Sequence, residues 1–130
     1  MTVRILLDTH IVVWAMVGSE KLSGKAKALL ADEESELYVS SASVWEVAIK
    51  HDKRPEQIPV TAEQVDRYCR ECGIRQLPVR FRHALKVAGL EKIHEDPFDR
   101  ILVAQAMDES MKLVSHDHRL PPYGDFVIEV

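Results

Sequence analysis

The amino-acid sequence predicts an α/β fold in which a central, mostly parallel sheet of four to five strands is covered by helices on both faces. Short apolar segments with strand-forming residues alternate along the chain with longer segments of helical periodicity. This alternation is typical of parallel strands joined by right-handed helical crossovers. No internal repeat, low-complexity tract or linker interrupts the pattern, so we expect residues 1–130 to form a single domain.

The first strand covers Val3–Leu7 and stops at Asp8, after which the apolar positions follow a helical period. Four more strands are predicted where apolar runs are bounded by turn residues: Glu36–Ser40, Ile74–Leu77, Lys112–Ser115 and Phe126–Ile128. Capping residues, prolines and glycines delimit the later helices: residues 25–30 after Ser23, Val44–Lys53, Thr61–Glu71, Phe81–Ala88 and a regular helix that opens at Asp96-Pro97.

The composition argues against several classes of protein. With 17 basic and 21 acidic residues the net charge is -4, which disfavours nucleic-acid binding by bulk charge but leaves room for a local basic patch. The two cysteines, Cys69 and Cys72, are too few for a disulfide framework, and no second pair completes a zinc site. Asp8 and His10 interrupt the apolar residues near the start, so we expect a cytoplasmic protein without a signal peptide or a membrane span.

Four places in the chain carry an acid where a strand ends or a helix begins. Asp8 follows the first strand, Glu46 lies near the start of the helix after the second strand, and Asp117 follows the fourth strand. Asp99, with Asp96 before it, lies in the first turn of the last helix. In a parallel sheet these places meet along the carboxyl edge, which is where open α/β sheets bind ligands.

Each acid also has a purely structural interpretation. Asp8 and Asp96 are favoured helix N-caps, and aspartate is common in turns. Glu46 could complete a capping box with Ser43, or pair with Lys50 four residues further on. The case for chemistry rests on all of these acids converging at one edge.

Converging carboxylates would repel one another by several kcal/mol at a protein-like dielectric, so a cluster is tolerable only with a cation or with shared protons. Oxygen ligands without cysteine or histidine at ligand spacing select a hard ion such as Mg²⁺ or Mn²⁺. Such an ion keeps open positions for water and phosphate oxygens. The acids therefore point to hydrolysis of a phosphodiester.

The acids lie in four segments that together are characteristic. These are Leu6-Leu7-Asp8-Thr9-His10, Ser43-Val44-Trp45-Glu46-Val47-Ala48-Ile49-Lys50, His94-x-Asp96-Pro97-Phe98-Asp99-Arg100-x-Leu102-x-Ala104-Gln105-Ala106 and Leu113-Val114-Ser115-x-Asp117. In this set and order the chain resembles the PIN-domain ribonucleases, and in particular the VapC-type toxins of type II (VapBC) toxin–antitoxin pairs.

The resemblance implies a PIN-like three-layer α/β/α fold and an endoribonuclease that depends on Mg²⁺ or Mn²⁺. By the same resemblance Asp8 would be the central metal ligand, Glu46 and Asp99 would complete the metal shell or hold its waters, and Asp117 would be the most variable contributor. Asp96 is either a helper or only the helix cap, and we favour the cap.

The resemblance also implies three partners: an RNA substrate, a cognate antitoxin whose tail lies across the acidic site, and a second copy of the chain in a homodimer. Thr9 would orient a carboxylate or a water, and Ser115 stands where relatives often carry threonine. Phosphate contacts are expected among the basic residues, which could equally be solvated surface charges: Lys50, Lys53, Arg54, Arg80, Arg82, Arg100 and Arg119.

Two other functions remain as alternatives. A PIN-like module that has lost catalysis could bind RNA or protein without cutting, although the intact set of acids argues against it. A haloacid-dehalogenase-like phosphatase would need a second aspartate two residues after Asp8, where the sequence has His10.

Other conspicuous residues have structural interpretations. Trp14 and Trp45 are interpreted as core residues, and His116 and His118 lack a nearby third ligand for zinc.

Overall fold

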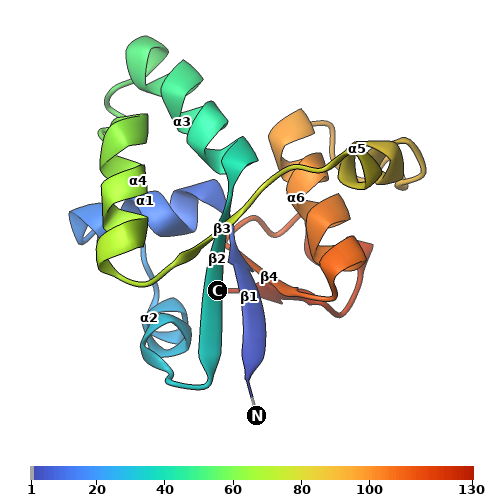
Figure 1. Ribbon diagram of the computed structural model, residues 1–130, viewed down its shortest axis with the longest axis horizontal. Helices are drawn as coiled ribbons and strands as arrows, with labels where there is room; N and C mark the ends of the chain where they lie inside the picture. Colours follow the sequence, from blue (N-terminus) through green and yellow to red (C-terminus); the bar gives the residue numbers. More distant parts are fainter. Residues whose placement is uncertain (1) are drawn as a thin grey trace.

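The computed structural model describes residues 2–130, and its centre is a five-stranded sheet in which every pair of neighbouring strands is parallel (Figure 1). The strands are β1 (Val3–Leu7), β2 (Ser35–Ser40), β3 (Arg75–Leu77), β4 (Lys112–Ser115) and β5 (Val127–Glu129). Their order in the sheet is β3-β2-β1-β4-β5. The first strand therefore lies in the middle, between β2 and β4.

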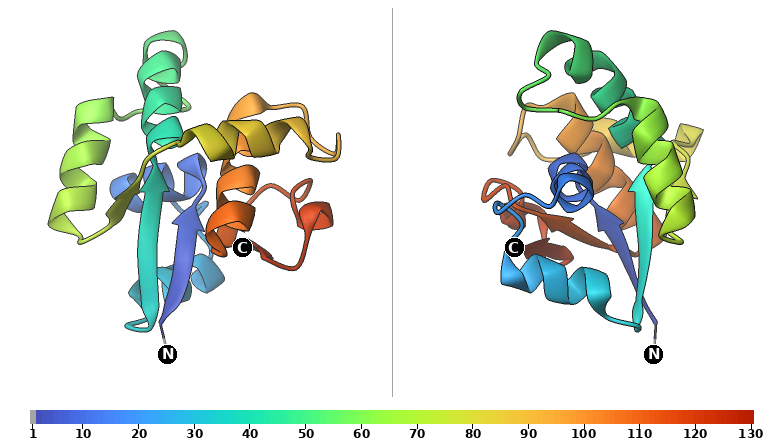
Figure 2. Two further views of the ribbon diagram at one scale, coloured as in Figure 1. Left: turned by 45° about the vertical axis from the view of Figure 1, so that its right-hand side comes forward. Right: turned by 90° about the vertical axis from the view of Figure 1, so that its left-hand side faces the viewer.

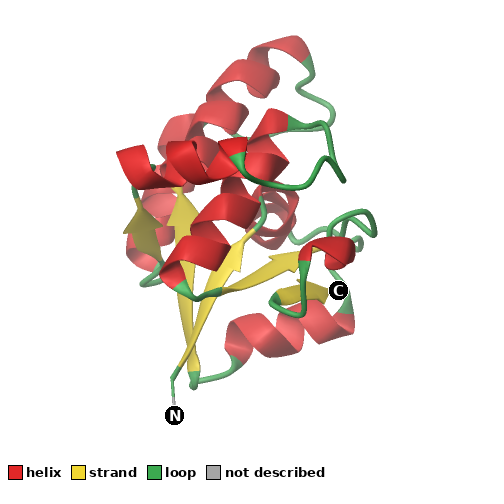
Figure 3. Cartoon of the chain, turned by 90° about the vertical axis from the view of Figure 1, so that its right-hand side faces the viewer, coloured by secondary structure: helices red, strands yellow, loops and turns green. Residues whose placement is uncertain are grey.

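Successive residues of β1 face opposite sides of the sheet, as the pleat requires. Ile5 and Leu7 are buried against α1 (Thr9–Val17), α2 (Gly24–Ala31), α3 (Ser41–Lys53) and α4 (Ala62–Glu71). Leu6 is buried on the other side, where α6 (Pro97–Glu109) supplies the apolar face and α5 (Phe81–Ala88) packs on α6. Figure 3 shows helices on both sides of the strands, which is the predicted three-layer arrangement.

Local signals explain where the helices begin. The hydroxyl of Ser23 accepts a hydrogen bond from the N–H of Ala26 at the start of α2. Thr61 and Gln64 form a reciprocal capping box at the start of α4. Asp96 caps α6 by accepting from the N–H of Phe98 at 2.9 Å, as predicted, and Pro97 takes the first helical position.

The predicted alternation of strands and helices is confirmed, with each predicted strand present to within about a residue at its ends. One prediction about the core is wrong. Trp45 leaves 63% of its surface exposed on α3, whereas Trp14 is half-buried against the helices that cover β1. Among the helices of residues 2–130, none has the length and apolar character needed to cross a membrane.

Candidate active site

The candidate site lies where the path of the chain through the sheet reverses. From β1 the chain moves through β2 to β3 on one side, and it then returns to place β4 and β5 on the other side of β1. The carboxyl ends of β1 and β4 flank this switch point, where open α/β sheets bind ligands. Figure 2 shows α1 and α3 starting directly beyond the tips of β1 and β2, so residues at the starts of these helices face the same end of the sheet.

A cavity of about 270 Å³ opens at this edge. All five acids named from the sequence line it, together with aromatic and basic side chains. Its lining residues are Asp8, His10, Trp14, Glu46, Lys50, Asp96, Asp99, His116, Asp117 and Arg119. Residues separated by up to about a hundred positions in the sequence thus converge, as the acid pattern predicted.

Asp8 does not act as a helix cap through its side chain, although it occupies the N-cap position of α1. Its Oδ2 instead accepts a hydrogen bond from the hydroxyl of Ser115, with 2.5 Å between the oxygens. The same Ser115 oxygen accepts from the N–H of Asp117 at 3.0 Å. Burial raises the pKa of Asp8, and the hydrogen bond from Ser115 partly opposes this effect.

Glu46 is 3% exposed, and its two carboxylate oxygens have different surroundings. Oε2 accepts a hydrogen bond from Nζ of Lys50 at 2.5 Å, which confirms the pairing considered from the sequence. Oε1 is buried and has no hydrogen-bond partner among residues 2–130. A buried carboxylate oxygen without a partner is costly, so its position in the cavity favours a bound cation.

The capping box that the sequence suggested for Glu46 is absent from the described structure. The helix begins earlier, at Ser41, and Ser40 caps it by accepting from the N–H of Ala42. The hydroxyl of Ser43 is occupied by Thr9, whose Oγ1 donates to it at 2.9 Å. Thr9 was expected to orient a carboxylate or a water, and it instead joins the starts of α1 and α3.

His94 is the functional residue whose role the sequence did not reveal. Its Nδ1 accepts the N–H of Asp96 at 3.0 Å, so the ring proton resides on Nε2 in the neutral form. That Nε2–H lies 2.9 Å from Oδ2 of Asp117 and 3.1 Å from Oδ2 of Asp99. His94 is buried, and its Nε2 hydrogen-bonds to Asp117 and lies beside Asp99, so it links carboxylates from two different elements. The three side chains together form a group with the geometry to hold a metal ion.

Asp117 is the best neutralised acid of the group. Arg119 holds it with two side-chain contacts, from Nε to Oδ1 at 3.0 Å and from Nη2 to Oδ2 at 2.9 Å. These hydrogen bonds, with the one from His94, keep the pKa of Asp117 below its ordinary value despite partial burial. Asp117 is therefore an anion at neutral pH.

Asp99 has the opposite electrostatic environment. Burial, and then the charges of Asp8, Asp96, Glu46 and Asp117, raise its pKa to about 8. Without a cation the cavity thus holds an acid that keeps its proton at neutral pH. Two buried and three partly buried carboxylates, one of them with an unpartnered oxygen, form a donor set of hard oxygens, which fits Mg²⁺ or Mn²⁺.

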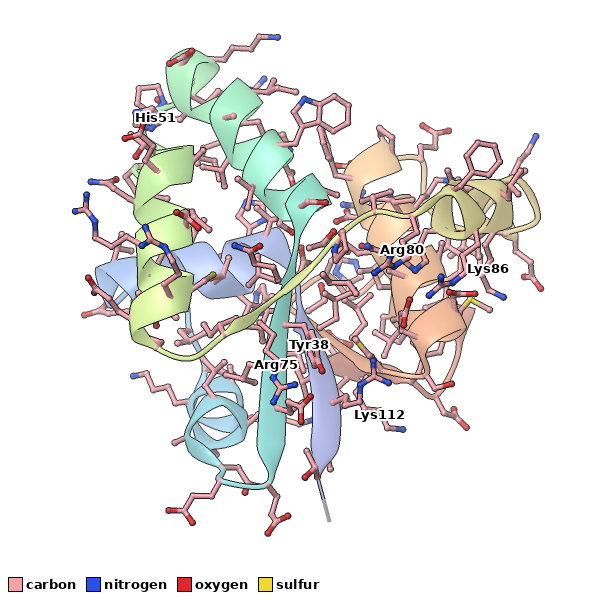
Figure 4. The ribbon with its side chains drawn as sticks, viewed as in Figure 1. Tyr38, His51, Arg75, Arg80, Lys86 and Lys112 are labelled. Carbon is pink, nitrogen blue, oxygen red and sulfur yellow. The ribbon has the colours of Figure 1, made fainter. Side chains whose placement is uncertain are left out.

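Of the basic residues that were expected to contact phosphate, only two line the acidic cavity. Lys50 and Arg119 line the cavity and pair with its acids. Arg100 instead donates to the backbone carbonyls of Val87, Glu91 and His94, so it holds the loop that carries the histidine. The others are exposed at other positions: Lys53, Arg54, Arg80 and Arg82. Figure 4 shows Arg80 beside α5 and α6, and Arg82 pairs there with Asp108 and Glu109.

The sequence of the chain matches a known family. Residues 5–125 match the model of the PIN domain, and the chain belongs to this family. The predicted fold class and the resemblance to PIN-domain proteins are therefore confirmed. Among curated proteins the chain is 30% identical over 120 residues to Ribonuclease VapC22 of Mycobacterium tuberculosis (strain ATCC 25618 / H37Rv), with 89% of this chain and 88% of that protein covered.

Solved structures share the fold at lower sequence identity. The structure of VapBC2 from Rickettsia felis bound to a DNA fragment from their promoter contains a similar chain, with a TM-score of 0.69 and 16% identity over 98% of this chain and 97% of that one. A toxin–antitoxin complex from Klebsiella pneumoniae gives a TM-score of 0.66 and 19% identity, with 97% and 99% covered. FitAcB from Neisseria gonorrhoeae gives 0.65 and 18%, with 97% and 96% covered.

Proposed function

We propose that this PIN-domain protein is an endoribonuclease that depends on Mg²⁺ or Mn²⁺, and that it acts in the cytoplasm as the toxin of a type II toxin–antitoxin pair. The observation that carries the proposal is the single cavity lined by Asp8, Glu46, Asp96, Asp99 and Asp117 at the switch point of the sheet. The relationship to a protein named as a ribonuclease supports the same conclusion.

In this proposal Asp8, Glu46, Asp99 and Asp117 are the catalytic acids and hold the divalent ion. The ion would activate water and stabilise charge on the phosphate oxygens. Ser115 fixes the orientation of Asp8, and Asp96 is assigned to capping α6. Lys50 and Arg119, which line the same cavity, are the residues placed to contact the RNA phosphates.

The test of the nuclease is cleavage of RNA by the purified chain with and without a divalent ion. We expect cutting only with Mg²⁺ or Mn²⁺, and none by Asp8→Asn at unchanged fold. Asp52→Asn is the matched control, because Asp52 is an exposed acid on α3 outside the cavity. Cutting by Asp8→Asn, or cutting in the presence of a chelator, would contradict the proposal. RNA binding without cleavage in any metal would instead favour the inactive module.

The proposed protein partner is a cognate antitoxin whose tail lies across the acidic cavity, where a cationic side chain of the partner would neutralise the carboxylates. Similarity to chains from VapBC and other toxin–antitoxin complexes supports this partner. A peptide bound in this way would compete with the divalent ion. We therefore expect the antitoxin to inhibit cleavage and to bind less tightly at high Mg²⁺ concentration.

We also propose that the chain forms a homodimer through the apolar surface of α3 and α5. A groove of about 490 Å³ lies there, and the exposed apolar residues Trp45 and Val79 line it. Phe81 and Leu85 are exposed on α5, the helix whose Ala84 and Val87 also line the groove. Contiguous apolar surface of this kind marks protein interfaces. Phe81→Glu is expected to convert a dimer into a monomer in light-scattering measurements, while the exposed Lys27→Glu on α2 should leave the dimer intact.

A further inference from the structure

A second cavity shares a wall with the acidic cavity. Its volume is about 340 Å³, and His10 and Trp14 line both cavities. The remaining lining residues come from the end of α1 and from the loops on either side: Val13, Val17, Ser19, Lys21, Glu56, Gln57 and Pro59. This volume is at the small end of the range for ligand sites, so it suits one planar ring system rather than a larger group.

We propose that this second cavity binds one nucleobase of the RNA, the base of a nucleotide next to the phosphate that is cut. The proposal rests on the proposed ribonuclease function. A phosphodiester in the acidic cavity is covalently attached to a nucleoside on each side, so a neighbouring base must lie close by. The adjoining cavity offers that base an aromatic side chain and hydrogen-bonding groups in one place.

Trp14 is the aromatic residue at the centre of this arrangement. His10 lies on one side with 5.7 Å between ring centroids, and His116 lies edge-on at 5.3 Å. The ring is half-buried by packing against the core, so it is held in place while part of it borders both cavities. Aromatic rings of this kind stack on unpaired bases, which favours single-stranded RNA.

Lys21 supplies positive charge beside the same ring. Its Nζ lies 6.0 Å from the centroid of Trp14, and no carboxylate in the described part of the chain forms a salt bridge with it. A free ammonium group at the rim of the cavity is placed to contact the phosphate of the bound nucleotide. The acid in the same cavity, Glu56, can accept a hydrogen bond from a base amino group.

The loop that carries Glu56 and Gln57 is fixed by hydrogen bonds before any ligand arrives. The N–H of Gln57 and the N–H of Ile58 both donate to the carbonyl of Arg54, at 3.0 Å each. His51 Nδ1 lies 2.8 Å from the carbonyl of Ile58, and Figure 4 shows His51 near the end of α3. The backbone that carries the exposed Gln57 is thus held at the cavity, and the side-chain amide is available to distinguish one base edge from another.

The test uses the fluorescence of Trp14, because the sequence has only two tryptophans and the other is the exposed Trp45. The variant Asp8→Asn/Trp45→Phe keeps Trp14 as its sole tryptophan and should leave bound RNA uncut. We expect a short single-stranded RNA to quench its emission. An oligonucleotide with an abasic site next to the scissile phosphate should quench little and bind about tenfold more weakly. Quenching that is unchanged by the abasic site would overturn the proposal.

Asp8→Asn/Trp14→Phe is the matched control, since its remaining Trp45 is expected to keep its emission when RNA binds. RNA that quenches Trp45 and not Trp14 would place the base elsewhere and overturn the proposal.

Gln57→Ala should change the base that is preferred at the cut site. Gln76→Ala, which alters an exposed glutamine on β3, should leave that preference unchanged. If the wild type cuts RNA and the emission of Trp14 does not change, the proposed base-binding cavity is wrong but the proposed ribonuclease function is retained. If no RNA is cut with any metal, the ribonuclease itself is wrong.

Discussion

The hydroxyl of Ser115 donates to Oδ2 of Asp8 across the junction of β4 and β1, with 2.5 Å between the two oxygens. Because the same oxygen accepts the N–H of Asp117, one small side chain joins two of the acids. Ser115 is fully buried. The orientation of the Asp8 carboxylate therefore depends on a single hydroxyl group, that of Ser115.

Ser115→Ala should lower the affinity for Mg²⁺ and the rate of RNA cleavage by about 10–100-fold, because groups that orient metal ligands have effects of this size. Ser115→Thr keeps the hydroxyl and should retain most of the activity. Calorimetric titration with Mg²⁺ and initial cleavage rates measure the two effects. Equal loss in both variants would show that the hydroxyl is not what matters.

His94→Ala should also weaken Mg²⁺ binding by about 10–100-fold, because Asp117 loses a hydrogen-bond partner and Asp99 loses a contact at 3.1 Å. His94→Gln can restore part of the effect, since its amide can donate from near the position of Nε2. His83 offers a matched control: it is also buried, it accepts from the N–H of Arg80, and it lies 2.8 Å from Glu109.

His83→Ala should lower the melting temperature but leave Mg²⁺ affinity and kcat near the wild-type values, because its partners lie outside the cavity. Similar losses of metal affinity in the His83 and His94 variants would mean that both act only through stability. A difference between them would assign to His94 a role at the metal site.

Asp99→Asn should abolish cleavage and yet stabilise the metal-free protein at pH 8. The pKa of Asp99 is about 8 in the folded chain against an ordinary 3.8, so between these values the folded state binds a proton that the unfolded state lacks. The free energy of unfolding therefore falls as pH rises from about 4 to about 8. Asparagine cannot ionise, so Asp99→Asn should raise the free energy of unfolding at pH 8 by an amount on the order of 1–3 kcal/mol.

Urea unfolding in the presence of a chelator measures that difference. The advantage of Asp99→Asn should disappear below the ordinary pKa of 3.8, at about pH 3, where the wild-type carboxyl is protonated in both states. An advantage that does not change with pH would point to packing and not to charge. The exposed Asp125→Asn serves as the control and should follow the wild-type pH dependence.

Mg²⁺ should raise the melting temperature of the wild type more at pH 8 than at pH 6. Binding requires ionised carboxylates and therefore displaces the proton of Asp99, which competes more strongly at the lower pH. At about one hundred times the dissociation constant, we expect a rise of roughly 5–10 °C at pH 8. Asp8→Asn should show little rise at either pH in the same thermal scans.

The sequence was sufficient to place the strands and the acids, because both depend on local patterns. The period change after Leu7 and the Asp96-Pro97 pair identify a strand end and a helix start without reference to any other part of the chain. Parallel pairing then brings the acids to one edge. The orientation of each carboxylate could not be predicted, since it depends on partners that are distant in the sequence.

His94 and Trp45 illustrate what local patterns omit. The histidine lies in an irregular segment between α5 and α6, and its role follows from contacts made by both ring nitrogens after the chain has folded. Trp45 lies on a helix with apolar residues on more than one side, and periodicity alone does not indicate which side faces solvent. A third case, Thr9, has its hydroxyl directed to Ser43 by the close approach of two helices.

The central position of β1 has a consequence for the synthesis of the protein. Asp8 emerges from the ribosome early, but β4, which pairs with β1 and leads to Asp117, is translated more than a hundred residues later. A nascent chain that has not reached this point has neither the hydroxyl that orients Asp8 nor the last carboxylate. The acidic cavity therefore cannot be completed until β4 and Asp117 have been synthesised.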